Sequence, residues 1–346
     1  MAEDPCHSQL TQNELELGLF MQYRNFGTTG WQVSATGLGT WGIGNQWGDI
    51  DDLTAAATLR SAFDHGVNLF DTAEGYGIPP GRSEERLGNA LKDVRDQTYI
   101  VSKIGSWGRR DGHTIPKTSV DIIRLCVHAS LYRLKTDWVD VMLCHEGDIE
   151  DPSLYLEAFE LLKQQGLIRA YGISTNEFEV LKRFNARNTC QVVEVDYSLL
   201  NRQAEADILP YCQAHDIAVL ARGPLAKGLL SGQYSLDSTF TDSVRASWNP
   251  GGSKRKKFKR QMAQVENLKQ ILPPGQEMVT TALRFVMEHP AQPLPIPGAK
   301  SAAQATVNAD AGDRPLSPQA QNYLTAVRGS ERHRSWPPAL QPGIFR

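Results

Sequence analysis

The chain has 346 residues, of which 40% are apolar and 22% charged, which is ordinary globular composition with enough chain for a large core. The net charge of −3 gives no overall field to attract nucleic acid or a membrane surface, and no apolar run approaches the length of a membrane span. Five cysteines without a C-x-x-C pair argue against a disulfide framework and against a metal site. Together with a polar N-terminus unlike a signal peptide, they indicate a cytoplasmic protein. The sequence carries no indication of oligomeric state.

The patterned part of the chain begins after a tail over residues 1–18 that we expect to be loose. Residues 23–34 alternate and turn near Gly30, which predicts a short hairpin. From there, short β-branched runs alternate with longer helical patterns. Strands are expected at residues 36–40, 67–70, 98–103, 138–145, 168–174, 191–197, 217–221 and 293–297, and helices at 52–66, 84–93, 119–134, 152–166 and 205–216.

Eight such units predict one closed fold of the α/β class. Strands that alternate with helices form right-handed βαβ units around a parallel sheet, and eight units give a (β/α)8 TIM barrel. We expect this single domain over residues 19–330, followed by an irregular Pro-rich tail over 331–346. A long connection is expected after the seventh strand, before Thr280, and connections of that length are usually lids or binding loops.

A competing interpretation starts from "GLGTWG" at residues 37–42, which matches the G-x-G-x-x-G of a dinucleotide-binding Rossmann unit. In that fold Asp71, at the end of the next strand, would hold a ribose hydroxyl. Two features oppose it. The segment "IGNQWGDIDD" separates the glycines from the helix whose N-terminus should face the phosphates, and the Trp41 side chain would crowd them. Eight units also fit a barrel better than two nucleotide-binding halves.

Four polar residues are expected at the barrel mouth, where the carboxyl ends of the strands meet. Asp71 ends the second strand, Tyr76 lies in the loop beyond it, and Lys103 and His145 end the third and fourth strands. Each alone has a structural explanation, such as a turn cap, and only their joint placement favours catalysis. A lysine cation lowers the pKa of a phenol, and Asp71 can hold that lysine. The set suits proton delivery to a carbonyl, and because no side chain supplies hydride, a nicotinamide cofactor is required.

Longer stretches resemble the aldo-keto reductases, a family of NADPH-dependent barrel oxidoreductases. In chain order, between about residues 23 and 310, these are "GVNLFDTAEGYG", "SKIG", "LCHEG", "GISTNEF", "VDYSLLNR", "GPLAKGLLSGQY" and "PIPGAKSAAQ". The resemblance implies reduction of small aldehydes or ketones, with Asp71, Tyr76, Lys103 and His145 as the catalytic tetrad and Tyr76 as the general acid–base. It also implies an alternative, because some barrels of this family are NADP-binding cytoplasmic subunits of potassium channels with slow turnover.

The resemblance further implies which residues hold NADP. Ser174, Asn176 and Gln191 would bind the carboxamide, Tyr197 would stack on the nicotinamide, and Thr40 and Trp41 would lie near the ring. Arg222, Gly223, Pro224, Leu225, Lys227 and Gly228 would follow the pyrophosphate, and Gly298, Lys300, Gln304 and Asn308 would hold the adenosine end. Lys300 precedes a helix and would bind the 2′-phosphate. Thr175 and the Arg222–Gly223 pair depart from the pattern common in the family.

Two features stay open at this point. Trp47 and Trp107 lie in mouth loops, where they either line the substrate pocket or pack within the loops. The run "KRKKFKR" at residues 254–260 resembles a nucleic-acid or nuclear-targeting patch. Apolar residues at helical spacing continue from it, which favours a solvated helix start. Attraction of an anionic cofactor is a further use of the same charges.

Overall fold

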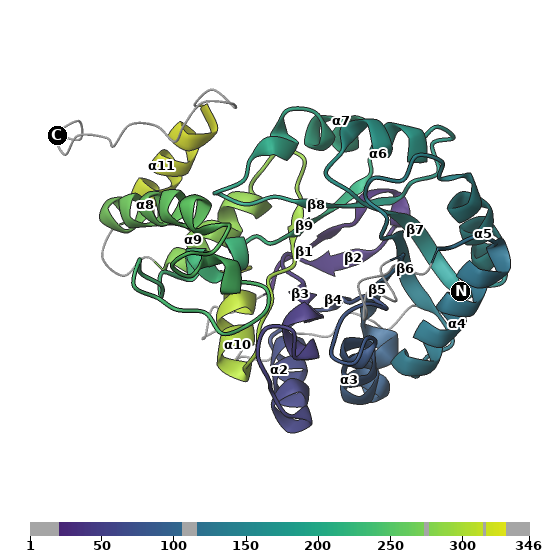
Figure 1. The fold of residues 1–346 in the computed structure, drawn as a ribbon. Coiled ribbons are helices and arrows are strands. Elements are labelled where there is room, and N and C mark those ends of the chain that lie inside the picture. Colours follow the sequence, from purple (N-terminus) through teal and green to yellow (C-terminus); the bar gives the residue numbers. More distant parts are fainter. Residues whose placement is uncertain (1–20, 106–115, 273–276, 314–315, 330–346) are drawn as a thin grey trace, which may run out of the picture.

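The computed structural model describes residues 21–105, 116–272, 277–313 and 316–329. Eight parallel strands form one curled sheet in the order β10-β9-β8-β7-β6-β5-β4-β3, and a separate antiparallel pair precedes them (Figure 1). The barrel strands are β3 (Leu38–Gly39), β4 (Leu69–Asp71), β5 (Tyr99–Ile104), β6 (Val139–Cys144), β7 (Ile168–Ser174), β8 (Val192–Asp196), β9 (Ala218–Arg222) and β10 (Leu294–Pro295). The hairpin strands are β1 (Tyr23–Asn25) and β2 (Gln32–Ser34). The predicted (β/α)8 barrel and the N-terminal hairpin are confirmed.

Helices follow the strands and surround the sheet (Figure 1). They are α2 (Asp52–Asp64), α3 (Arg82–Leu91), α4 (Val120–Leu134), α5 (Ser153–Gln164), α6 (Phe178–Phe184), α7 (Ile208–Ala214), α8 (Arg255–Ile271), α9 (Met278–Met287), α10 (Ala302–Asp310) and α11 (Pro318–Gly329). Side-chain caps start several of them: Asp51 accepts a hydrogen bond from Thr54 N at 2.7 Å, and Ser119 accepts one from Ile122 N at 3.2 Å. The five helices expected from the sequence are all present.

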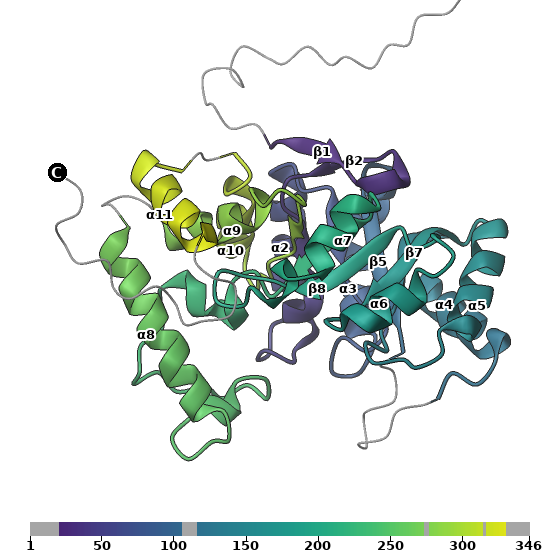
Figure 2. The same ribbon diagram turned by 90° about the horizontal axis from the view of Figure 1, so that it is seen from above.

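The barrel interior is an apolar layer that the hairpin closes at one end (Figure 2). Phe26 and Val33 of the hairpin belong to one buried cluster with the inward-facing strand residues, which are Leu69, Val101, Val141, Leu143, Ala170, Val192, Ala218, Leu220, Leu294 and Ile296. The barrel is therefore filled, as small parallel barrels are, and not a channel. The polar residues at the carboxyl ends of the strands lie at the other end of the barrel, away from the hairpin.

The barrel closes where β3 meets β10, and this seam is weakly bonded. Gly37 N donates to the Pro295 carbonyl at 2.9 Å, and Gly39 N donates to the Pro297 carbonyl at 3.0 Å. Pro295 and Pro297 return no such bond, because proline has no N–H. At Pro295 and Pro297 the bonds therefore come from the β3 side only, and a parallel bridge between Gly39 and Gly298 continues the seam beyond them.

The glycines of "GLGTWG" serve this closure and not a phosphate cradle. A Cβ added to Gly39 would lie 2.8 Å from the Ile296 carbonyl oxygen, so only glycine allows the two strands to approach this closely. The following helix, α2, begins at Asp52, well beyond the glycines. The Rossmann interpretation is therefore wrong.

The structure adds elements that the sequence patterns did not indicate. The helix α6 has 7 residues, which is too short for a helical period to stand out. The connection after β9 contains two short 3-10 helices, Ala226–Ser231 and Ala246–Trp248, before α8. The predicted tails at 1–18 and 331–346 lie outside the described residues. Within the part of the chain that the structure describes, no helix is both long and apolar enough to cross a bilayer.

Candidate active site

The ammonium group of Lys103 is the centre of the site. Lys103 lies on β5 and is completely buried. Its Nζ lies 2.5 Å from Asp71 Oδ2, 2.9 Å from the Thr72 carbonyl oxygen and 3.4 Å from the Tyr76 hydroxyl. β4 and β5 are neighbours in the sheet, so the lysine reaches across from one strand end to the next. The Asp71 carboxylate holds Lys103, which is the second of the two roles that its position allowed.

The Tyr76 ring is fixed by aromatic and cationic neighbours. It stacks on Trp41 with ring centroids 5.8 Å apart, and the His145 ring meets its edge with centroids 5.9 Å apart. Lys103 Nζ lies 4.9 Å from the centroid of the Tyr76 ring. The structure thus brings together all four residues predicted as the tetrad, with the phenol between the lysine and the histidine.

A fifth charged residue, Glu194 on β8, joins this cluster and was not predicted. Its side chain is 1% exposed, and its Oε2 forms an ion pair with Lys103 Nζ at 3.1 Å. Ser174 Oγ donates a hydrogen bond to its Oε1 at 3.2 Å, and Arg222 Nε lies 3.9 Å from the same oxygen. Glu194 therefore connects the tetrad lysine to two residues that were expected to bind the cofactor.

Burial and charge shift the pKa values of the cluster in defined directions. Burial acts to lower the pKa of Lys103, but the charges of Asp71 and Glu194 outweigh it and raise that pKa above its usual value. The pKa of Glu194 is lowered, because Lys103, Arg222 and His145 outweigh its burial. Burial raises the pKa of Tyr76, with Asp71 and Glu194 adding to the rise and Lys103 opposing it. These shifts favour the charged form of Lys103 and the protonated form of the Tyr76 phenol.

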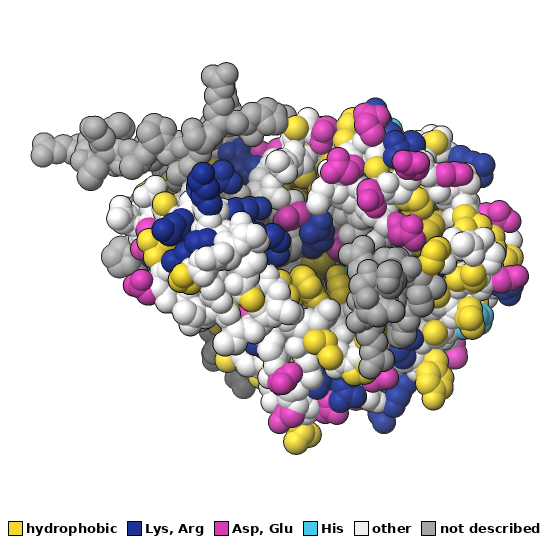
Figure 3. Space-filling view, viewed as in Figure 1, with side chains coloured by type: hydrophobic (Ala, Val, Ile, Leu, Met, Phe, Trp, Pro, Cys, Tyr) yellow, Lys and Arg dark blue, Asp and Glu magenta, His cyan; other side chains and the backbone are white. Residues whose placement is uncertain are grey.

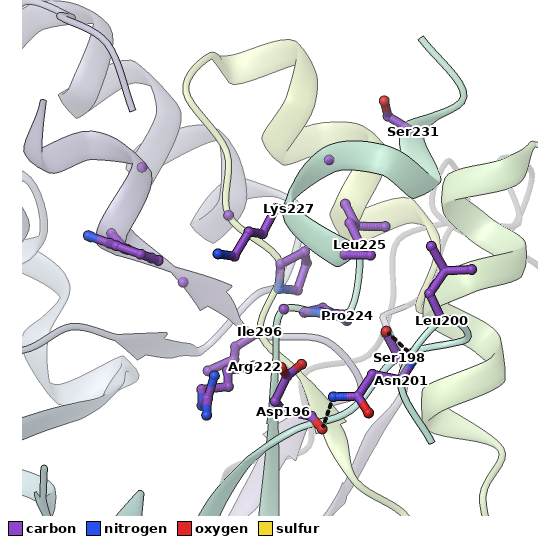
Figure 4. Close-up of a pocket in the computed structure, with 18 of the residues that line it drawn as sticks. Asp196, Ser198, Leu200, Asn201, Arg222, Pro224, Leu225, Lys227, Ser231 and Ile296 are labelled. Carbon is purple, nitrogen blue, oxygen red and sulfur yellow. Dashed lines mark hydrogen bonds between the residues drawn. The ribbon is translucent and has the colours of Figure 1, made fainter. Parts of the chain in front are cut away.

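A cavity of about 1810 Å³ extends from this cluster along the loop after β9. Figure 4 shows part of its wall, where Arg222, Pro224, Leu225 and Lys227 follow one another along that loop. The predicted residues that line the cavity are Trp41, Trp47, Asp71, Tyr76, His145, Ser174, Arg222, Gly223, Pro224, Leu225, Lys227, Gly228, Gly298, Lys300, Gln304 and Asn308. Most of the expected cofactor positions therefore share one cavity with the tetrad.

Two predicted cofactor residues make hydrogen bonds at the ends of strands beside the site. Thr40 is fully buried, and its hydroxyl donates to the Asp71 carbonyl at 2.8 Å, so it holds the end of β4. Asn176 Oδ1 accepts a hydrogen bond from Asp196 N at 2.9 Å and closes the end of β8. Neither side chain lines the cavity, and their expected contact with the nicotinamide stays a prediction.

Two other expected positions lie away from the cavity altogether. Gln191 precedes β8, so it lies at the opposite end of the barrel, where its Oε1 accepts a hydrogen bond from Lys163 Nζ at 2.8 Å. Tyr197 is fully buried, packs against Phe285 of α9, and donates to Glu205 Oε1 at 2.8 Å. Their assignment to the carboxamide and to ring stacking does not fit this geometry.

Contacts between loops cross the rim of the cavity at Trp47. Lys300 Nζ donates to the Trp47 carbonyl at 2.6 Å, and the Arg245 guanidinium lies 5.3 Å from the Trp47 ring centroid. The Trp41 and Trp47 rings meet edge to face with centroids 5.1 Å apart. Trp47 thus faces the site and is held by residues after β9 and β10. Trp107, its predicted companion, lies outside the described residues.

The sequence model of the Aldo/keto reductase family matches residues 35–328. The chain belongs to this family. Among its relatives, the Bacillus subtilis (strain 168) protein "Aldo-keto reductase YhdN" is 32% identical over 294 residues, covering 82% of this chain and 86% of the relative. The "NADH-specific methylglyoxal reductase" of Escherichia coli (strain K12) is 32% identical over 265 residues, covering 71% and 76% of the two chains.

A solved aldo-keto reductase has the same fold. The crystal structure of the Klebsiella pneumoniae enzyme in complex with NADPH aligns with a TM-score of 0.66 at 30% identity, covering 89% of this chain and 95% of that one. The chain is therefore an aldo-keto reductase in sequence and in fold, and a nicotinamide cofactor is the one bound by its structural relatives.

Proposed function

We propose that this aldo-keto reductase reduces aldehydes or ketones to alcohols with NADPH and that Tyr76 donates the proton. The observation that carries the proposal is the position of the Tyr76 hydroxyl, 3.4 Å from the Lys103 ammonium and beside His145, on the wall of a cavity rich in cations. Family membership supports the reaction class. Nothing among the described residues favours the channel-subunit alternative.

Each residue of the cluster has a role in moving one proton. The Tyr76 hydroxyl donates its proton to the carbonyl oxygen of the substrate, and the Lys103 ammonium stabilises the phenolate that remains. Asp71 and Glu194 keep Lys103 charged and in place. The His145 ring donates a hydrogen bond that orients the carbonyl oxygen. The rings of Trp41 and Trp47 lie beside the Tyr76 ring on the wall of the cavity.

The cavity fits a dinucleotide cofactor, which supplies the hydride when bound. Ser174 and Arg222 lie beside the tetrad and would hold the nicotinamide end, while the loop after Arg222 would follow the phosphates. Ala226 and Lys227 adopt left-handed backbone conformations with φ of 49° and 58°, after Leu225 in a right-handed one, and such successions form concavities that bind anions. Lys300, just before α10, would bind the 2′-phosphate. The NADPH complex of the Klebsiella relative supports NADPH as the cofactor. Because another relative is named as NADH-specific, the preference of this protein for NADPH over NADH has to be measured.

The deciding experiment removes the proton and keeps the ring. Tyr76→Phe should lower kcat for a panel of aldehydes by at least 10²- to 10⁴-fold, the usual contribution of a general acid, with little change in NADPH affinity. Steady-state assays with NADPH and with NADH give kcat, and fluorescence titration gives the Kd of each cofactor. A Tyr76→Phe variant with near-normal kcat would remove Tyr76 from the mechanism. One slow oxidation of bound NADPH, without further turnover by the unmodified protein, would favour the channel-subunit reading.

A further inference from the structure

The helix α8 has one apolar face and one basic face toward the cavity. Phe258, Met262, Val265 and Leu268 are buried, which confirms the helical spacing seen in the sequence, and Phe258 packs on Phe240 and Trp248 of the connection after β9. Lys254, Lys257 and Arg260 recur every third residue, so they lie along one side of the helix. All three line the cavity that contains Tyr76 and His145. Figure 3 shows Lys and Arg side chains gathered over this part of the molecule.

Ion pairs do not neutralise these cations in the part of the chain that the structure describes. Among the described residues, no ion pair joins Lys227, Lys254, Lys257 or Arg260 to an acidic side chain, although other basic residues at the cavity are paired, such as Arg245 with Asp242 at 2.9 Å. The nearby cations also act on one another. Burial lowers the pKa of Lys227, and the charges of Lys254, Lys257 and Arg222 lower it further, against the opposing charge of Asp196. Uncompensated positive charge inside a concave wall indicates an anionic ligand.

The remaining basic residues of the run "KRKKFKR" do not share this position. Lys256 and Lys259 are exposed on the same helix, yet neither lines the cavity. Lys254, Lys257 and Arg260 are exposed as well, so the two sets differ only in that these three line the cavity. Positive charges along the wall of a cavity suit a small anion.

We propose that the cavity-facing side of α8, formed by Lys254, Lys257 and Arg260 together with Lys227, binds phosphate groups. Lys227 belongs to the loop after β9, and the three residues of α8 add side-chain cations to that part of the cavity. The phosphates come either from the dinucleotide or from a phosphorylated carbonyl substrate, and in both cases the wall extends the binding region beyond the residues expected from family resemblance. The proposal rests on the proposed function for the identity of the ligand, but not for the presence of the anion site.

Two matched double variants test the wall. Lys254→Gln with Lys257→Gln removes two cavity-facing charges, and Lys256→Gln with Lys259→Gln removes two solvent-facing charges from the same helix turns. Calorimetric titration with inorganic pyrophosphate measures the wall directly. Fluorescence titration gives the Kd of NADPH, and kcat/KM for glyceraldehyde and glyceraldehyde 3-phosphate at saturating NADPH reports on the substrate.

The cavity-facing double variant should bind pyrophosphate about tenfold or more weakly than the unmodified protein. This difference in affinity should become smaller as the salt concentration is raised. The control variant should stay within about twofold of the unmodified protein. A parallel rise in the Kd of NADPH assigns the phosphate to the dinucleotide, whereas loss of a preference for the phosphorylated aldehyde, with an unchanged Kd, assigns it to the substrate. Equal behaviour of the two double variants, in pyrophosphate binding as in the other assays, overturns the proposal. Failure of the unmodified protein to turn over NADPH would instead count against the proposed function, since pyrophosphate binding does not depend on turnover.

Discussion

Replacement of Lys103 by methionine removes the charge that the Tyr76 phenolate faces while it keeps most of the side-chain volume. At the observed separation of 3.4 Å, and with an effective dielectric constant of about 20, the ammonium stabilises the phenolate by about 5 kcal/mol. That energy corresponds to roughly 3.5 pKa units. The phenol should therefore become a much weaker acid, and kcat for carbonyl reduction should fall by about 10²- to 10⁴-fold.

The assay compares kcat, the Kd of NADPH and thermal stability in Lys103→Met and in the unmodified protein. Because Lys103→Met leaves two buried carboxylates without their cation, the variant should also unfold at lower temperature. The double variant Lys103→Met with Glu194→Gln removes one of those carboxylates and should recover stability without recovering kcat. If the single variant keeps kcat within about threefold while Tyr76→Phe is inactive, Lys103 does not tune the phenol and the electrostatic argument is refuted.

Three more variants test charged residues of the cavity. Glu194→Gln removes a charge that raises the pKa of Tyr76, so the fall of kcat/KM for reduction at high pH should begin at lower pH; a pH profile displaced upward contradicts this. Asp71→Asn should lower kcat less than Lys103→Met does, because Glu194 still holds the lysine, and should change NADP affinity less than about tenfold; a large affinity loss with an unaltered kcat would restore the ribose role. Lys300→Ala should weaken NADPH binding roughly ten- to hundredfold and NADH binding far less, as titration of both would show, and equal losses would exclude a 2′-phosphate contact.

The barrel and the tetrad were predictable because both depend on strand order and strand ends. A residue that follows an apolar run ends a strand, and the ends of neighbouring parallel strands converge whatever the loops do. Asp71, Lys103 and His145 all carry that signal. The same logic explains the error at Gln191: it begins a strand, so it had to lie at the far end of the barrel.

Side-chain alternation explains Tyr197 and Glu194. Successive residues of a strand point to opposite faces, and on β8 Val192 packs inside the barrel while Val193 and Val195 belong to the outer core with Tyr197. This alternation turns the side chain of Tyr197 toward the helices and that of Glu194 toward the barrel axis. An acidic residue within an apolar strand pattern was the feature of the sequence from which Glu194 could have been predicted as a site residue.

That signal is not specific to active sites. Asp140, also inside an apolar strand, lies near the start of β6, where Arg95 and Arg169 bind its two oxygens at 2.7 Å each. It is a structural ion-pair centre at the far end of the barrel. The two carboxylates differ in position along the strand and in face, because Asp140 alternates with the inward-facing Val141 and Leu143 whereas Glu194 shares the inward face of Val192. Both differences depend on strand boundaries, which are the least certain part of a sequence pattern.

The seam between β3 and β10 has fewer backbone donors than a strand pair without prolines. Pro295 and Pro297 cannot donate, so on the β10 side only the bridge at Gly298 returns a bond to β3. The cavity lies directly above, with Trp41 and Gly42 on one lip and Gly298 and Lys300 on the other. A ligand that touches both lips acts as a clamp across the joint, so part of its binding free energy is the free energy of keeping the barrel closed. Ligand binding and local opening between β3 and β10 are therefore coupled, so that a bound ligand lowers the frequency of opening.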